Sequence, residues 1–279
     1  MNERIVQVNG IEIFTESFGN PTDPAVLLMM GAMSSMIWWE YEFCDRIAKT
    51  GRFVIRYDNR DVGRSTCYAP GNPEYNFEDM ADDAVHILDA YRIEKAHIIG
   101  MSMGGMLAQM IALKHADRVL SLTLVSTSNW APELPPMEEK VIEFFGKAGA
   151  VDWSFEQSVI DFAIGRERVL IGSKHELDEE RVIRLTTEEI RRARNLPSMN
   201  NHALLSGGEE YLTRTSEIEV PALIIHGTED PIIPYAHGVN LTSVIPDSRL
   251  LTLEGTGHEL HRNDWGVIIN EIVDFTSTR

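Results

Sequence analysis

The hydrophobic positions of this chain follow two patterns, one typical of buried strands and one typical of helices. Segments with the two patterns alternate along the chain, which predicts parallel strands interleaved with helices. Short, continuous apolar runs are typical of strands that are buried on both faces. They lie at residues 25–30, 52–57, 96–99, 119–125, 220–225 and 249–253. Between them, apolar residues recur at helical spacing. The helices are expected at residues 39–50, 77–91, 103–115, 236–244 and 263–276. The pattern therefore predicts an α/β fold with a mostly parallel sheet flanked by helices.

The start of the chain has a different pattern. Residues 3–8 and 11–17 are typical of strands, and Asn9-Gly10 between them is a strong signal for a type I′ turn. We therefore expect the sheet to begin with a two-stranded antiparallel hairpin.

Between residues 129 and 215 the strand signals disappear. Amphipathic, charge-rich helices are expected there instead, at residues 137–147, 155–164 and 179–194. An insertion of this kind predicts a helical cap over the carboxyl ends of the strands, where open parallel sheets place their sites. The expected division is a first core part at 1–128, a cap at 129–215 and a second core part at 216–279.

Composition narrows the class of protein. A chain of 279 residues with 43% hydrophobic content can bury a large core. No apolar run approaches the length of a membrane span, and the polar residues 1–4 lack the hydrophobic region of a signal peptide. We therefore expect a cytoplasmic protein without membrane contact, in which Cys44 and Cys67 are reduced. The net charge of −18 argues against nucleic-acid binding, which needs cationic side chains.

The segment Gly100-Met101-Ser102-Met103-Gly104 joins a predicted strand to a predicted helix. A serine between two such glycines is typical of a nucleophile elbow, a turn too tight for a Cβ at the glycine positions. The turn would project the Ser102 hydroxyl above the sheet, beside a helix N-terminus that favours negative charge. The pentapeptide alone also fits an ordinary loop, but the flanking strand and helix favour the elbow.

A serine hydroxyl becomes a good nucleophile at neutral pH only when a neighbouring base accepts its proton, and that base needs an acidic residue that orients it. After an elbow of this type the acid precedes the histidine along the chain. Asp230 follows the predicted strand at 220–225 and is the candidate acid. An aspartate that only caps the turn before Pro231 is the structural alternative, and Glu229 is the competing acid.

The candidate base is His258, in a glycine-containing loop directly after the strand at 249–253. His261 is its rival, and His226 at a strand end is expected to be a structural histidine. The pair His258 and His261 does not have the His-Glu-x-x-His spacing, and no third ligand is evident, so we predict no metal site.

An oxyanion hole requires two backbone N–H groups aimed at one point. One is expected from Met103, directly after the serine, and the other from the loop that follows the strand at 25–30. Gly31 would let that loop approach the substrate. Our choice there is Ala32, with Met33 as the alternative.

With these residues the chain resembles the α/β-hydrolase superfamily along essentially its whole length, and the helical insertion resembles the cap of that family. Residues 58–65 resemble its largely structural loop, Asp-x-Arg-x-x-Gly-x-Ser. Within the superfamily the chain is similar to anthracycline methyl esterases of the aclacinomycin type. This similarity rests on residues 30–32, 55–66, 100–104 and 220–234. Most members place His-Gly before the oxyanion residue, whereas this chain and the methyl esterases have Met-Gly.

The expected activity is that of a serine hydrolase acting on a carboxylic ester of a small, largely apolar molecule through an acyl-enzyme. Ser102 would attack the carbonyl, His258 would transfer the proton and Asp230 would orient His258, with no cofactor. A carbon–carbon bond hydrolase or a cofactor-free perhydrolase would use the same triad. A ligand sensor that has this fold without catalysis is the alternative from another class.

Apolar side chains near these segments are candidates for the substrate pocket. They are Met33, Trp38 and Trp130, although methionine and aromatic clusters more often belong to the core. The sequence does not identify the substrate, because the geometry of the cap determines substrate choice. It does not indicate the oligomeric state either, because no motif bears on it.

Overall fold

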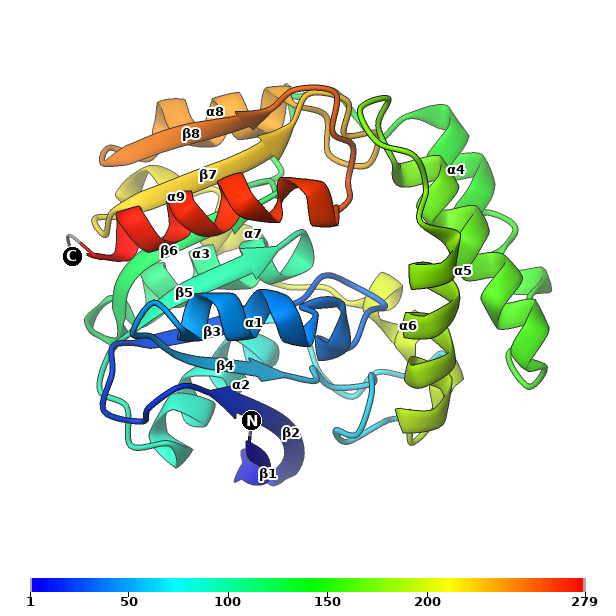
Figure 1. Ribbon diagram of the computed structural model, residues 1–279, viewed down its shortest axis with the longest axis horizontal. Helices are drawn as coiled ribbons and strands as arrows, with labels where there is room; N and C mark the ends of the chain where they lie inside the picture. The colour runs from blue at the N-terminus through cyan, green and yellow to red at the C-terminus, as the bar shows by residue number, and fades with distance from the viewer. Residues whose placement is uncertain (1, 278–279) are drawn as a thin grey trace.

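The computed structural model describes residues 2–277, and within them the strands form one eight-stranded sheet in the order β1-β2-β4-β3-β5-β6-β7-β8 (Figure 1). The strands are β1 (Asn2–Val8), β2 (Ile11–Phe18), β3 (Ala25–Met29), β4 (Phe53–Tyr57), β5 (Ala96–Met101), β6 (Val119–Val125), β7 (Ala222–Gly227) and β8 (Ser248–Leu253). From β4 to β8 all neighbouring strands are parallel, whereas β1 and β2 pair antiparallel and β2 joins β4 antiparallel. The predicted fold class is confirmed.

The hairpin that opens the sheet has the expected turn. Asn9 and Gly10 both have positive φ values, 47° and 79°. A type I′ turn needs positive φ at both central residues, and Asn-Gly supplies them at little cost. The turn fixes the register between β1 and β2, with Val8 opposite Ile11.

Helices cover both faces of the sheet and enclose a separate apolar core on each face (Figure 1). One face carries α1 (Tyr41–Ala48) and α9 (Trp265–Ser277), and the other carries α2 (Phe77–Ala90), α3 (Met103–Lys114), α7 (Glu209–Leu212) and α8 (Ala236–Val244). Side chains alternate between the two cores along each strand, so that Leu27 faces one core while Val26 and Leu28 face the other. Burial on both faces explains why the strand sequences are continuously apolar.

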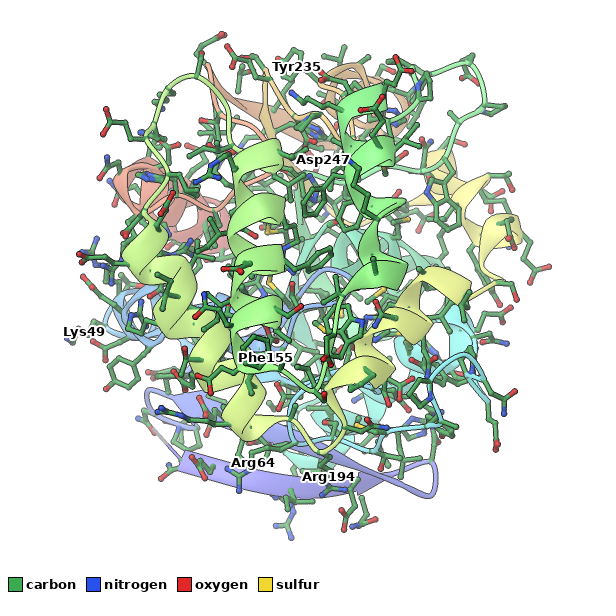
Figure 2. The ribbon with its side chains drawn as sticks, turned by 90° about the vertical axis from the view of Figure 1, so that its right-hand side faces the viewer. Lys49, Arg64, Phe155, Arg194, Tyr235 and Asp247 are labelled. Atoms are coloured by element: carbon green, nitrogen blue, oxygen red, sulfur yellow. The ribbon has the colours of Figure 1, made fainter. Side chains whose placement is uncertain are left out.

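Three helices stand apart at one end of the sheet, on the right of Figure 1. They are α4 (Glu139–Phe145), α5 (Glu156–Leu170) and α6 (Glu179–Arg192), and α5 packs against both others. Figure 2 faces this group, with the exposed Phe155 just before α5. We use the term cap helices for α4, α5 and α6. They lie where helical segments are predicted, whereas α7 was not predicted and packs against α3 of the core.

Short 3₁₀ helices complete the connections. They are η1 (Met36–Trp38), η2 (Ala116–Arg118), η3 (Ala148–Ala150), η4 (Leu196–Leu204), η5 (Thr215–Glu217) and η6 (Arg262–Asp264). Several predicted boundaries were wrong by two residues, and the helix expected at 155–164 continues six residues further, to Leu170. The helix expected from residue 39 begins at Tyr41, because Glu40 has an extended backbone with ψ of 151°. The strand expected from residue 220 begins at Ala222, because Pro221 has no N–H for the ladder.

The described helices include none that is long and apolar enough to span a membrane. Cys44 and Cys67 are both free thiols, in line with the expectation that they are reduced. Burial raises the pKa of the Cys44 thiol to about 12, so this group stays protonated at neutral pH.

The first turn of α3 lies unusually close to β3. A Cβ on Gly104 would be 2.4 Å from the carbonyl oxygen of Met29, and a Cβ on Gly100 would be 2.1 Å from the carbonyl oxygen of Gly104. Neither neighbour is a side chain that could rotate away, because both are backbone atoms. Glycine is therefore required at both positions by close approach.

We predict that Gly104→Ala destabilises the protein by about 1–3 kcal/mol or more, because its methyl group overlaps the β3 backbone. Gly266→Ala is the matched control, since Gly266 is also helical and a Cβ there meets nothing within 4 Å. The control is expected to leave stability unchanged or to raise it by up to about 1 kcal/mol. Urea unfolding of both variants measures the difference, and equal midpoints would contradict the packing argument.

Candidate active site

Ser102 lies at the junction between β5 and α3 in a strained backbone conformation, with φ of 54° and ψ of −119°. Its N–H donates to the carbonyl oxygen of Val125 at 2.9 Å, and its own carbonyl oxygen accepts from Thr127 Oγ1 at 2.7 Å. A positive φ at a residue other than glycine costs roughly 1–3 kcal/mol and persists only where its surroundings enforce it. The sheet edge therefore fixes this serine at the N-terminus of α3.

Asp230 and His258 form a buried hydrogen-bonded pair in the loops after β7 and β8. His258 Nδ1 lies 2.7 Å from Asp230 Oδ2. Because an ionised carboxylate only accepts, Nδ1 is the donor and Nε2 is left unprotonated in the neutral ring. Asp230 Oδ1 accepts from the N–H groups of Ile232 and Ile233 at 3.0 Å and 2.8 Å. The aspartate thus caps its turn and also orients the histidine.

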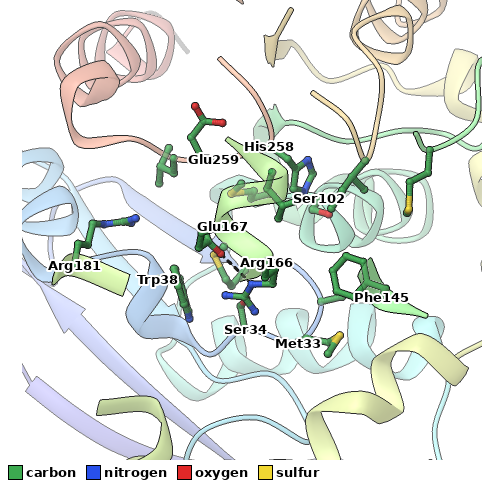
Figure 3. A pocket seen from close by; sticks show the side chains of 18 residues that line it. Met33, Ser34, Trp38, Ser102, Phe145, Arg166, Glu167, Arg181, His258 and Glu259 are labelled. Atoms are coloured by element: carbon green, nitrogen blue, oxygen red, sulfur yellow. Dashed lines mark hydrogen bonds and ion pairs between the residues drawn. The ribbon is translucent and has the colours of Figure 1, made fainter. Parts of the chain in front are cut away.

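Ser102 and His258 line the same cavity and lie next to each other in Figure 3. The Ser102 hydroxyl makes no hydrogen bond with any other residue in the described range 2–277. In free enzymes the contact between nucleophile and base often closes only when substrate binds. The structure thus places Ser102 and His258 at one cavity, while Asp230 does not line it and is hydrogen-bonded to His258.

The charge of His258 is set by opposing effects. Burial lowers its pKa, but the Asp230 carboxylate, with smaller contributions from Glu167 and Glu259, raises it above the ordinary value of 6.5 overall. Glu259, the next residue, has its own pKa raised to about 7 by burial. Because a Glu259 carboxylate raises the pKa of His258, the ionisation of the two groups is coupled.

Glu229, the competing acid, does not contact the histidine. It is exposed and accepts hydrogen bonds from the N–H and Oγ of Ser173, both at 2.7 Å, and these bonds lower its pKa. Ser173 belongs to the connection between α5 and α6, residues 171–178. Next to it, the His258 N–H donates to the Leu170 carbonyl oxygen at 2.9 Å. Glu229 therefore ties the cap helices to the loops that carry Asp230 and His258.

The other two histidines have structural surroundings. The ring of His261 stacks on His175 with centroids 4.0 Å apart, and its Nδ1 accepts from the Asn263 N–H at the start of η6. His226 is fully buried, and its Nε2 lies 2.7 Å from the carbonyl oxygen of Ile233. Burial lowers the pKa of His226, which keeps this ring neutral.

The loop after β3 meets the elbow at Gly31, where a Cβ would lie 3.1 Å from the Cβ of Ser102. The N–H of Met33, the alternative oxyanion donor, is already engaged, because it donates to His202 Nδ1 at 3.0 Å. The N–H of Ala32 has no acceptor among the described residues. This difference favours Ala32 as the partner of Met103.

The cavity has two lobes that meet at Ala32, Ser102, Met137 and Ile232. The smaller lobe, about 220 Å³, is the one shown in Figure 3. Its lining includes His258, Trp38, Met33 and the charged side chains Arg166, Glu167, Arg181 and Glu259. The larger lobe, about 470 Å³, is lined mainly by apolar side chains that include Phe77, Met103, Met106, Trp130 and Met137.

The charged side chains of the smaller lobe were not predicted from the sequence. Arg166, Glu167 and Arg181 lie on amphipathic cap helices, where charged residues usually face solvent. Glu259 could have been suspected from its place directly after His258.

A strained serine between strand and helix, beside a buried aspartate–histidine pair at the carboxyl edge of a mostly parallel sheet, is the arrangement of the α/β-hydrolase class. The family model described as "alpha/beta hydrolase fold" matches residues 24–263, so the chain belongs to that family.

Two curated relatives agree with this class. Rhodomycin D methylesterase DauP of Streptomyces sp. (strain C5) is 28% identical over 298 residues, which cover 93% of each chain. Rhodomycin D methylesterase DnrP of Streptomyces peucetius is 27% identical and covers the same shares. These relatives confirm the resemblance to anthracycline methyl esterases that the motifs predicted.

The solved structures show the same fold. The enol-lactonase from Burkholderia xenovorans LB400 superposes with a TM-score of 0.78 at 23% identity, over 98% of this chain and 100% of that chain.

We predict that kcat/KM falls as the pH drops through the pKa of His258, because a protonated imidazole cannot accept a proton from Ser102. Since that pKa lies above 6.5, the acidic limb should also lie above pH 6.5. Glu259→Gln removes a charge that raises this pKa, so the limb should move to lower pH. The pH profile of kcat/KM on an uncharged ester measures the shift. The exposed Glu254→Gln is the control, and an unmoved limb in Glu259→Gln would refute the prediction.

Proposed function

We propose that this protein is a serine hydrolase that cleaves carboxylic esters of small, largely apolar molecules through an acyl-enzyme. The observation that carries the proposal is the 2.7 Å hydrogen bond between Asp230 and His258 at the wall of the cavity that Ser102 also lines. The names of the two methylesterase relatives support the ester as the substrate class.

In this mechanism the Ser102 hydroxyl attacks the ester carbonyl while His258 Nε2 accepts its proton. The N–H groups of Ala32 and Met103 stabilise the oxyanion, and the Asp230 carboxylate stabilises the imidazolium. His258 then donates the proton to the leaving alkoxide, and the alcohol departs. Water, deprotonated by His258, hydrolyses the acyl-enzyme and restores the serine. These steps need no cofactor.

The cap at residues 129–215 is proposed to select the substrate. Its helix α5 supplies Arg166 and Glu167 to the smaller lobe, whereas Ser102, Asp230 and His258 all lie outside the cap. The apolar side chains of the larger lobe suit the larger, apolar part of the ester.

Ser102→Ala tests the proposal directly. We expect it to fold normally and to lose esterase activity by several orders of magnitude, because removal of the nucleophile disables the triad as a unit. Hydrolysis of p-nitrophenyl esters measures the loss, and circular dichroism controls for folding. A fluorophosphonate probe should label the wild type and not the variant. Activity within about tenfold of wild type in pure Ser102→Ala protein would exclude the mechanism.

A second test separates the two neighbouring acids. Asp230→Asn should keep the fold but lower kcat by roughly 10⁴-fold, because the amide favours the wrong tautomer of His258. Glu229→Gln is the matched control: it loses a charged contact to Ser173 and should keep kcat within about tenfold of wild type. If Glu229→Gln proved the inactive variant and Asp230→Asn the active one, the acid would be Glu229.

A further inference from the structure

The smaller lobe contains a buried guanidinium that the proposed mechanism does not use. Arg166 comes from cap helix α5 and is only 8% exposed. Its Nε donates to Glu167 Oε1 at 2.9 Å, and its Cζ lies 4.8 Å from the centroid of the Trp38 ring. In Figure 3 the side chain lies in the cavity near Ser34, with its bond to Glu167 drawn as a dashed line. The stacking and the ion pair together fix its position.

The terminal nitrogens of Arg166, Nη1 and Nη2, have no hydrogen-bond acceptor among residues 2–277. Arg181 lines the same lobe, and its Nε likewise donates to a carboxylate, that of Glu40, at 2.6 Å. Polar groups that line a cleft usually bind a ligand or water. The four N–H bonds of Nη1 and Nη2 therefore form a donor site that faces the cavity.

The position of His258 indicates which part of an ester would reach this donor site. His258 must donate a proton to the leaving oxygen, so the alcohol part lies within hydrogen-bond reach of its ring. His258 lines the smaller lobe, together with Arg166. Met103, the oxyanion donor on α3, lines the larger, apolar lobe. The alcohol part thus faces Arg166, and the acyl part occupies the larger lobe.

Charge in the smaller lobe selects among oxygen acceptors. Glu167 already neutralises Arg166, and Glu259 lines the same lobe. Above about pH 7, where Glu259 is ionised, a carboxylate on the substrate would therefore meet two negative charges, whereas a ketone or hydroxyl oxygen would accept from Nη1 and Nη2 without that repulsion.

We propose that the smaller lobe is a subsite for an uncharged oxygen acceptor in the alcohol part of the ester, bound by Nη1 and Nη2 of Arg166. The inference rests on the proposed ester hydrolysis and adds a substrate class to it: esters of alcohols that carry a ketone or hydroxyl group.

Three hexanoate esters test this subsite in the wild-type protein. The 4-oxopentyl ester presents a ketone, the 4-methylpent-4-enyl ester replaces the ketone oxygen by an isosteric CH₂ group, and the 3-carboxypropyl ester presents a carboxylate. We expect kcat/KM to be about 10- to 100-fold higher for the ketone than for the alkene, the range for a hydrogen bond from a charged donor. The carboxylate ester should fall below the ketone. Equal values for ketone and alkene, or a preference for the carboxylate, would overturn the proposal.

Arg166→Met assigns the preference to the guanidinium. In this variant the ratio of kcat/KM for the ketone ester over the alkene ester should fall to about one. Intrinsic differences in leaving-group reactivity cancel when this ratio is compared with the wild-type ratio. Arg168→Met is the matched control, because Arg168 lies on the same helix but is exposed and pairs with Glu179. The control should retain the wild-type ratio. A ratio retained in Arg166→Met would show that another group binds the ketone and would refute the role of Arg166.

If Arg166→Met does not fold, Arg166→Gln provides the same test, because its amide keeps polar contact in the lobe but removes the charged fork. The wild-type comparison of ketone with alkene stands independently of either variant. The esters also separate this inference from the proposed function. Hydrolysis of all three esters without a ketone preference rejects only the subsite. Failure to hydrolyse any of them, together with no fluorophosphonate labelling of Ser102, rejects the serine-hydrolase mechanism itself.

Discussion

The contact between the start of α3 and the end of β3 is the constraint on which the site depends. The backbone of Gly104 lies so close to the Met29 carbonyl that a single methyl group would not fit. This approach presses the serine against the loop that follows β3, where Gly31 nearly touches Ser102. Close backbone packing thereby holds Ser102 beside this loop, together with the hydrogen bonds of Ser102 to Val125 and Thr127.

Features with a local cause were predictable from the sequence. The glycines of the elbow occur where a Cβ does not fit, Asn9-Gly10 occurs where φ is positive, and buried strands are apolar throughout. Asp230 and His258 were found because each follows a strand whose carboxyl end must reach the same edge of the sheet. Such signals lie within a few residues of the feature that they predict.

Features that depend on distant parts of the chain were not predictable. The N–H of Met33 donates to His202, which lies 169 residues away in sequence, and no local pattern predicts this bond. Arg166 has the sequence pattern of a solvent-facing residue, and it is buried because α5 packs over Trp38. The polarity of the smaller lobe therefore depends on how the cap packs against the core. The periodicity of residues within a single helix does not predict it.

The cap is hydrogen-bonded to the loops that carry Asp230 and His258. The connection between α5 and α6 is bonded to the loops after both β7 and β8, through Ser173 to Glu229 and through Lys174 to Gly255. Separation on that side would break the bond that Leu170 makes with His258 and disturb the base itself. The start of α4 is bonded to the same region, because the N–H of Glu138 donates to the carbonyl oxygen of Pro231 at 2.9 Å. A change in the position of the cap would therefore also move the loops that carry Asp230 and His258.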